Sequence, residues 1–172
     1  MNKNKFLLSI LVHNESGVLT RVSGLFARRG YNIESLSVGE TEKPDISRIT
    51  VVAVGGDYER DQIIKQLQKL HDVLILEEMD ETAVVSRELM LIKVNISQGK
   101  RSEVLEAVSV FRAKVVDLTP LSLTVEITGE QSKCDAFLEY LKPFGVAELT
   151  RTGVTAIGRG QDILLKKKKS EE

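Results

Sequence analysis

The segment Asn14-Glu15-Ser16-Gly17-Val18-Leu19 combines residue types that can bind a small zwitterion. It lies where a strand pattern changes to a helix pattern. The unpaired N–H groups and the dipole at a helix start attract a carboxylate. Gly17 lets a ligand approach the backbone. The Asn14 amide can accept from an ammonium group or donate to a carboxylate. Ordinary N-capping by Ser16 or Asn14 explains the same residues, so both interpretations stay open.

Other residues with reactive side chains do not form a recognisable catalytic set. His13 and His71 follow no metal-ligand spacing, and we expect structural or surface roles for both. Cys134 is the only cysteine, which excludes an intramolecular disulfide and a multi-cysteine zinc site. It lies on an apolar helical stripe, so a buried thiol is expected. The sequence contains no G-x-S-x-G elbow, and Gly55-Gly56-Asp57 is a turn rather than a phosphate loop.

Composition narrows the class of protein. The chain has 172 residues, 42% of them hydrophobic, with 24 basic against 25 acidic side chains. This balance argues against a nucleic-acid binder with a basic face. No apolar run reaches the roughly 20 residues of a membrane span, and the first residues lack a cleavable signal pattern. We therefore expect a cytoplasmic protein that is not inserted in a membrane.

The first half of the chain predicts strand, helix, strand, strand, helix, strand. Strands are expected at 5–13, 32–39, 46–54 and 73–79. The first helix begins near Val18 and ends at Gly30, and the second carries Ile63, Ile64, Leu67 and Leu70 on one stripe. Gly24 within the first helix is unfavourable by about 1 kcal/mol relative to alanine, which predicts close packing against another backbone.

The second half repeats this order without repeating the residues. Strands are expected at 88–96, 113–118, 121–128 and 146–157, and helices at 101–111 and around Cys134 to Leu141. Two successive βαββαβ units predict an α+β protein with two ferredoxin-like domains. The predicted domains are 1–80 and 88–160, joined by a short linker at 81–87. A disordered charged tail is expected at 161–172.

Several segments resemble one family closely. They are LVHNESGVLTRVSGLFARRGYNIESLSVG at 11–39, SRITVVAVGG at 47–56, FRAKVVDLTP at 111–120, DAFL at 135–138 and RTGVTAIGRG at 151–160. Together they resemble the small, regulatory subunits of acetolactate synthase (acetohydroxyacid synthase). The resemblance implies that the first domain is an ACT domain, a ligand-sensing βαββαβ module.

The resemblance also implies a role and a site. It implies a non-catalytic subunit that binds a large catalytic subunit, raises the activity of that transferase and confers feedback inhibition by valine in valine and isoleucine biosynthesis. This chain would hold no cofactor; thiamine diphosphate, magnesium and FAD would belong to the large subunit. Valine would bind between two chains of a homodimer. One chain would contribute Asn14, Gly17, Val18 and Leu19, and the other Asn32 and Ile33.

Three other functions are compatible with the topology. A free-standing amino-acid sensor would share the valine site but have no enzyme partner. An RNA-binding module of the RRM type would place aromatic side chains on a central strand, and ISRITVVAV at 46–54 has none. A small hydrolase of this fold would show turnover alone, and we expect none.

Overall fold

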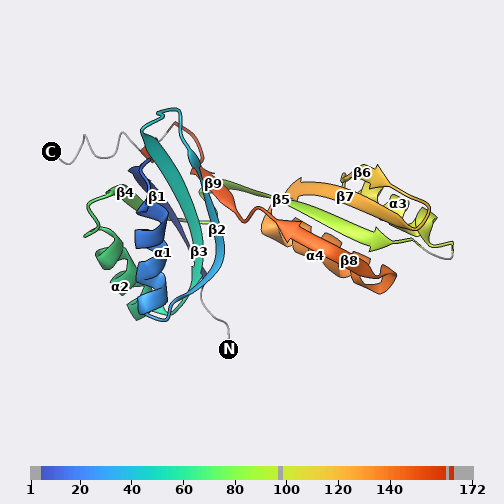
Figure 1. Cartoon of the computed structure of the whole chain (residues 1–172), viewed down its shortest axis with the longest axis horizontal. Coiled ribbons are helices and arrows are strands. Elements are labelled where there is room, and N and C mark those ends of the chain that lie inside the picture. The colour runs from blue at the N-terminus through green and yellow to red at the C-terminus, as the bar shows by residue number, and fades with distance from the viewer. Residues whose placement is uncertain (1–4, 97–98, 162, 165–172) are drawn as a thin grey trace. The chain divides into compact units, whose positions relative to one another are not determined.

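The computed structural model describes residues 5–96, 99–161 and 163–164. It divides into two units, formed by the chain up to Val85 together with the chain from Val154, and by Ser86–Gly153. The first unit has a four-stranded antiparallel sheet, and the second unit contributes four strands to a five-stranded one. In each unit two helices cover one face, so the predicted ferredoxin-like fold is confirmed (Figure 1).

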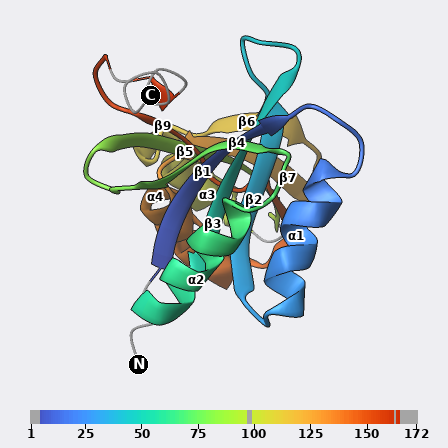
Figure 2. The same ribbon diagram turned by 90° about the vertical axis from the view of Figure 1, so that its left-hand side faces the viewer.

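The first unit begins with six elements in the predicted order. They are β1 (Lys5–His13), α1 (Val18–Arg28), β2 (Asn32–Glu40), β3 (Ile46–Val54), α2 (Asp57–Leu67) and β4 (Val73–Met79). The strand order is β2-β3-β1-β4. Helices α1 and α2 cover the same face of this sheet (Figure 2). Val18, Val22, Leu25 and Phe26 of α1 pack on the apolar residues of β1 and β3 there.

The second unit repeats the arrangement. Its elements are β5 (Val84–Asn95), α3 (Arg101–Val110), β6 (Lys114–Leu118), β7 (Ser122–Gly129), α4 (Gln131–Leu141), a 3-10 turn (Lys142–Phe144) and β8 (Val146–Arg151). The first two residues of β5 belong to the first unit. The strand order β6-β7-β5-β8 matches that of the first sheet. Met90, Ile92 and Val94 of β5 face the buried residues of α3 and α4.

The structure divides the chain differently from the predicted domain boundaries. Residues 81–87 do not form a linker, because β5 starts at Val84 and continues across the boundary. The expected strand at 146–157 is two strands, β8 and β9 (Thr155–Gly158), separated by Thr152-Gly153-Val154. β9 pairs with β5, and the chain from Val154 onward belongs to the first unit.

The returning segment covers the second face of the first sheet. Val154 and Ala156 are buried with Leu7, Val52, Met79 and Val84. The Ser37 hydroxyl donates to the Val154 carbonyl at 2.8 Å, and the Val154 N–H donates to the Ser35 hydroxyl at 2.7 Å. β1 and β3 have apolar side chains on both faces, and the helices cover only one face. Burial of the other face is favourable, which explains why the chain from Val154 packs on the first sheet.

The expected disordered tail at 161–172 contains a buried residue. Leu164 is buried with Leu11 and Ile46, so the prediction of disorder is wrong at this position. Residues 162 and 165–172 lie outside the described residues. Gly24 of α1 has no atom within 4 Å of an added Cβ, so close packing against another backbone is not found within the described chain.

Candidate functional site

The loop between β1 and α1 ends in Gly17, which is the N-cap of the helix. Its φ angle of 82° lies in the left-handed region, which favours glycine over other residues. Within the described residues no side chain caps this helix, so the expected caps Ser16 and Asn14 are wrong. The Val18 N–H donates to the Glu15 carbonyl at 3.4 Å. The N–H groups of Leu19 and Thr20 that follow carry the positive end of the helix dipole.

Asn14 is held by the loop between β2 and β3. Its Nδ2 donates to the Pro44 carbonyl at 2.9 Å, and its Oδ1 accepts from the Ser47 hydroxyl at 3.0 Å. An asparagine amide has two N–H groups and two lone pairs. These bonds leave one N–H and one lone pair for a ligand, and they fix the direction in which the amide points.

Val18 and Leu19 have different environments at the start of α1. Val18 is 3% exposed and packs in the core, so it anchors the helix start on the sheet. Leu19 is 39% exposed, which is high for a large apolar side chain. Of these two predicted site residues, Leu19 is therefore the one able to contact an apolar ligand group directly.

Sequence reasoning missed an ion pair that supports this loop. Arg21, four residues after Gly17, donates from Nε and Nη2 to both carboxylate oxygens of Asp72, at 2.5 and 2.7 Å. This hydrogen bonding holds the pKa of Asp72 below its usual value and raises the pKa of Arg21. A cation in the first turn interacts unfavourably with the positive end of the helix dipole. The negative charge of Asp72 offsets this unfavourable interaction. The position of Arg21 in that turn was the available sequence signal, but its partner is 51 residues away.

The Arg21 side chain also limits the space above Gly17. A Cβ atom added at Gly17 would lie 3.1 Å from Arg21 Nη1. This contact is tighter than ordinary van der Waals packing and would displace the guanidinium. Glycine at position 17 thus suits both the backbone conformation and the packing of the neighbouring ion pair.

Asn32 and Ile33 lie far from this loop in the same chain. Asn32 and Lys5 both pair with Val54, so Asn32 lies at the end of the sheet where β1 begins. His13, which precedes Asn14, pairs with Ile46 at the other end. The nine residues of β1 separate the two groups by about 27 Å. Asn32 is exposed, and Ile33 packs partly on the core. One chain therefore does not bring the six predicted site residues together.

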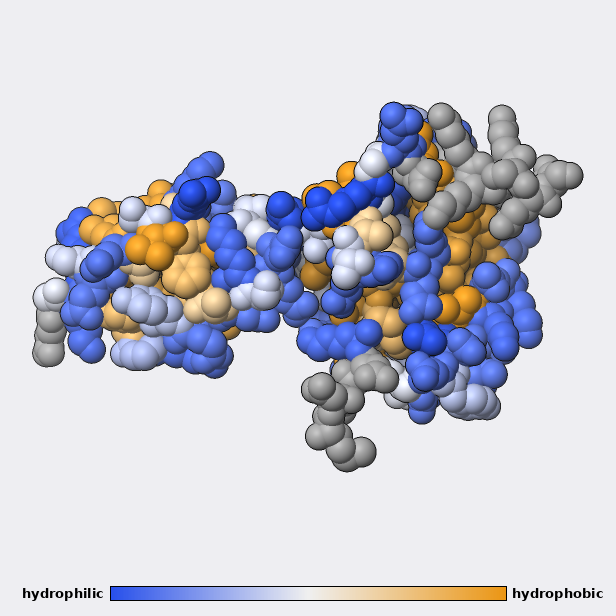
Figure 3. Space-filling view, turned by 180° about the vertical axis from the view of Figure 1, so that it is seen from behind, coloured by the Kyte–Doolittle hydropathy of each residue, from blue (hydrophilic) through white to orange (hydrophobic). Residues whose placement is uncertain are grey.

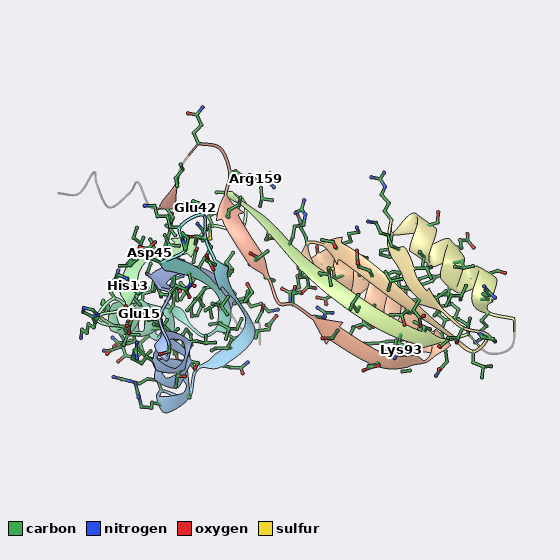
Figure 4. All side chains as sticks on the ribbon, turned by 45° about the horizontal axis from the view of Figure 1, so that its top comes forward. His13, Glu15, Glu42, Asp45, Lys93 and Arg159 are labelled. Carbon is green, nitrogen blue, oxygen red and sulfur yellow. The ribbon has the colours of Figure 1, made fainter. Side chains whose placement is uncertain are left out.

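The two histidines lie beside the loop rather than in a metal site. The His13 and His71 rings stack with centroids 6.3 Å apart. Figure 4 places His13, Glu15 and Asp45 on one side of the first unit. Within the described residues, no group of three His, Cys, Asp or Glu side chains is arranged to hold a metal ion.

A hollow lies on the face of the first sheet that α1 and α2 do not cover. It has a volume of about 450 Å³ between the sheet and the returning segment, and Arg48, Glu77, Asp80 and Arg159 contribute charged groups to its lining. None of the six predicted site residues lines it. The hollow is a consequence of the return of the chain to this face, which the sequence did not predict.

Two family comparisons cover most of the chain. Residues 8–75 match the AHAS small subunit-like ACT domain, and residues 87–160 match the small subunit of acetolactate synthase. The chain belongs to the acetolactate synthase small subunits. The prediction that the first unit is an ACT domain is confirmed.

Individual small subunits agree with this assignment. A probable acetolactate synthase small subunit of Methanothermobacter thermautotrophicus is 48% identical over 161 residues, which cover 93% of this chain and 96% of the relative. The acetolactate synthase small subunit of Mycobacterium bovis is 50% identical over 160 residues, covering 93% and 95% of the two chains. The crystal structure of the Thermotoga maritima small subunit matches with a TM-score of 0.84 and 40% identity, over 92% of this chain and 99% of that one.

Membership of this small-subunit family supports a regulatory rather than a catalytic role and implies a large catalytic partner. None of the helices in the described part of the chain has the length and apolar content needed to cross a membrane.

Proposed function

We propose that this small subunit binds valine between two ACT units of a homodimer and transmits the binding to the large subunit. It raises the activity of that subunit and confers feedback inhibition on valine and isoleucine biosynthesis, in the cytoplasm. In this proposal the large subunit carries thiamine diphosphate, magnesium and FAD, and the small subunit carries no cofactor.

The start of α1 supports binding of the amino-acid carboxylate. No side chain of the described residues caps the first-turn N–H groups, and Gly17 is exposed, with the Arg21 guanidinium beside it. The remaining lone pair of the Asn14 amide suits an ammonium group, and the exposed Leu19 suits a short aliphatic side chain. These three features match the three parts of valine.

The strand register supports a site shared between two chains. β2 is an edge strand, and its last residue, Glu40, pairs with Ser47, the residue that bonds Asn14. If β2 pairs antiparallel with β2 of a second copy about Leu36, Asn32 of that copy lies opposite Glu40. The two halves of the predicted site, about 27 Å apart in one chain, then meet at the same end of the sheet. The proposal chiefly rests on the pairing of Glu40 with Ser47, which places the end of the edge strand β2 beside the residue that bonds Asn14.

The regulatory effect follows from a shift between states of the holoenzyme. Valine favours the dimer arrangement that closes the shared site, and the shift is limited by its difference in affinity between the two states. One methylene contributes only about 1–3 kcal/mol to discrimination in an apolar pocket. Leucine and isoleucine are therefore expected to be weaker effectors than valine.

Calorimetric titration and reconstitution test the proposal together. The full chain is titrated with L-valine, with L-leucine and D-valine as controls, and is then mixed with the large subunit in an acetolactate assay. Saturable, stereospecific binding near one site per chain, activation of the large subunit, and inhibition by valine are expected. Activation without any valine binding, alone or in the holoenzyme, would contradict the valine site. Valine binding without activation would instead indicate a free-standing sensor.

A further inference from the structure

Strand β6 forms an exposed edge of the second sheet. The strand order β6-β7-β5-β8 leaves one side of β6 without a neighbouring strand among the described residues. All five of its residues, Lys114–Leu118, are exposed. An edge strand offers unpaired N–H and C=O groups, so such an edge is suited to pair with another strand.

The surroundings of this edge are apolar. Leu105, Val110, Val115, Val116, Leu118 and Leu121 are between 38% and 71% exposed. Apolar residues are visible among polar ones on the second unit in Figure 3. The edge strand of the first sheet differs. Among the described residues of β2, Val38 is the only large apolar residue that is exposed. β6 is short and carries the charges of Lys114 and Asp117, which can also protect an unpaired edge. Its exposed apolar side chains, rather than a lack of charge, are what favour a covering strand.

A β-bulge gives β6 an unusual arrangement of charges. Lys114 is opposite Glu126 and Asp117 is opposite Thr124, with the register shift between Val115 and Asp117. Glu126 and Thr124 are two residues apart on β7 and so face the same side of the sheet. Lys114 and Asp117 therefore share that face, although residues three apart in a regular strand point to opposite faces.

We propose that β6 pairs antiparallel with β6 of a second copy of this chain. In this register Lys114 of each copy is opposite Asp117 of the other, and Val115 and Val116 lie between the two ion pairs. Directly opposite residues of an antiparallel pair point to the same face, a requirement that the bulge satisfies. The segment Lys-Val-Val-Asp is its own charge complement, which favours a second copy over an unrelated partner.

The contact is separate from the proposed valine site. It involves Lys114–Leu118 of the second unit, whereas the valine proposal involves β2 and the start of α1 in the first unit. A failure of either proposal therefore leaves the other open to its own test. The contact uses the same segment of both copies, so it is isologous and is completed by two chains.

Cysteine cross-linking tests the register directly in the full chain. Two proteins are made, Lys114→Cys and Asp117→Cys, and each is oxidised alone and after mixing with subunit exchange. The native Cys134 is buried, and burial raises the pKa of its thiol to about 11, so it contributes little background. A disulfide-linked dimer is expected in the mixture and not in either protein alone. No cross-link in the mixture, or equal cross-linking in each protein alone, would overturn the proposal.

Charge reversal supplies an independent measurement. Lys114→Glu or Asp117→Lys places like charges opposite each other, and each change is expected to weaken self-association in sedimentation by about tenfold. The combined variant restores opposite charges and recovers association. Lys65→Glu on α2 makes the same charge change away from the edge and serves as the control. Unchanged self-association in both single variants would contradict pairing between copies. So would unchanged self-association combined with a loss of binding to the large subunit.

Discussion

The two units share a sheet order but differ in how their sheets are buried. In β1 and β3 nearly every residue is buried, because α1 and α2 cover one face and the segment from Val154 covers much of the other. In β5 and β7 burial alternates, since among the described residues α3 and α4 cover one face of that sheet. Lys93 and Glu148 form an ion pair on its open face.

This difference shows what a nearly continuous apolar strand means in an antiparallel sheet. Alternation of apolar and polar residues is expected when one face meets water. The run KFLLSILVH in β1 lacks this alternation. Leu7 and Leu11 lie on the face away from the helices, and the chain from Val154 onward buries them. The first unit is thus completed by the C-terminal part of the chain, whereas the second is contiguous.

The largest expected effect comes from placing a charge under the returning segment. Ala156 is 2% exposed among apolar side chains, so Ala156→Asp is expected to lower the free energy of unfolding of the first unit by about 3–4 kcal/mol. Thr150→Asp, on an exposed position of β8, should change stability by no more than about 0.5 kcal/mol. Urea unfolding followed by hydrogen exchange in each unit measures both. Equal effects would contradict the difference in burial.

The two described ion pairs with the least exposed carboxylates sharpen the comparison. In the second unit Arg151 donates to the buried Glu88 at 3.0 Å and to Asp135 at 2.6 Å. Arg151→Ala leaves the Glu88 carboxylate buried without its cation, so a loss of about 3 kcal/mol is expected. Arg21→Ala should cost less, because the Arg21 side chain is 46% exposed and water can replace it. Thermal unfolding of both variants measures the two losses of stability. A larger loss for Arg21→Ala than for Arg151→Ala would refute this prediction.

At the valine site the decisive change is Gly17→Asp. Its carboxylate would face the ligand carboxylate, and valine binding should weaken by roughly 100-fold while activation of the large subunit survives. Gly17→Asn has a similar shape without the charge and tolerates the left-handed backbone better than most residues. It should therefore retain more affinity in calorimetry. Wild-type affinity in the Asp variant would show that the site is misplaced.

The smallest effect expected is a pH dependence due to Asp72. Its pKa is lowered in the folded state by hydrogen bonding with Arg21. The unfolded carboxyl protonates first as the pH falls, so the stabilisation is present above about pH 4 and is lost below it. Comparison of wild type with Asp72→Asn in acid unfolding measures this contribution. Parallel stability curves for the two proteins would contradict it.

Local patterns predicted most of the fold. The bounds of β1, β3 and β4 agree with the predicted strands, because hydrophobic patterning there is bounded by clear turn residues. Gly30 ends the first helix region with a φ of 68°, as expected for a helix stop. The Gly17-centred loop was also found as a candidate site from its residue types alone.

Contacts between distant residues were not predictable in this way. The division of 146–157 into β8 and β9 depends on apolar residues of the first sheet, not on the local sequence. Likewise, Asn14 does not cap α1, because Pro44 and Ser47 engage its amide from another loop. The partner of Asn32 in the proposed site belongs to a second chain, so neither the sequence nor one folded chain brings the two together.

Mixed dimers test the shared valine site most directly. Gly17→Asp and Asn32→Ala are each expected to weaken valine binding strongly when present in both chains, by roughly 100-fold for Gly17→Asp. Dimers with one chain of each type, purified through two different tags, would have one site with both changes and one site intact. Calorimetry should then recover about half of the wild-type number of sites at near wild-type affinity. No recovery in verified mixed dimers would contradict a site built from two chains.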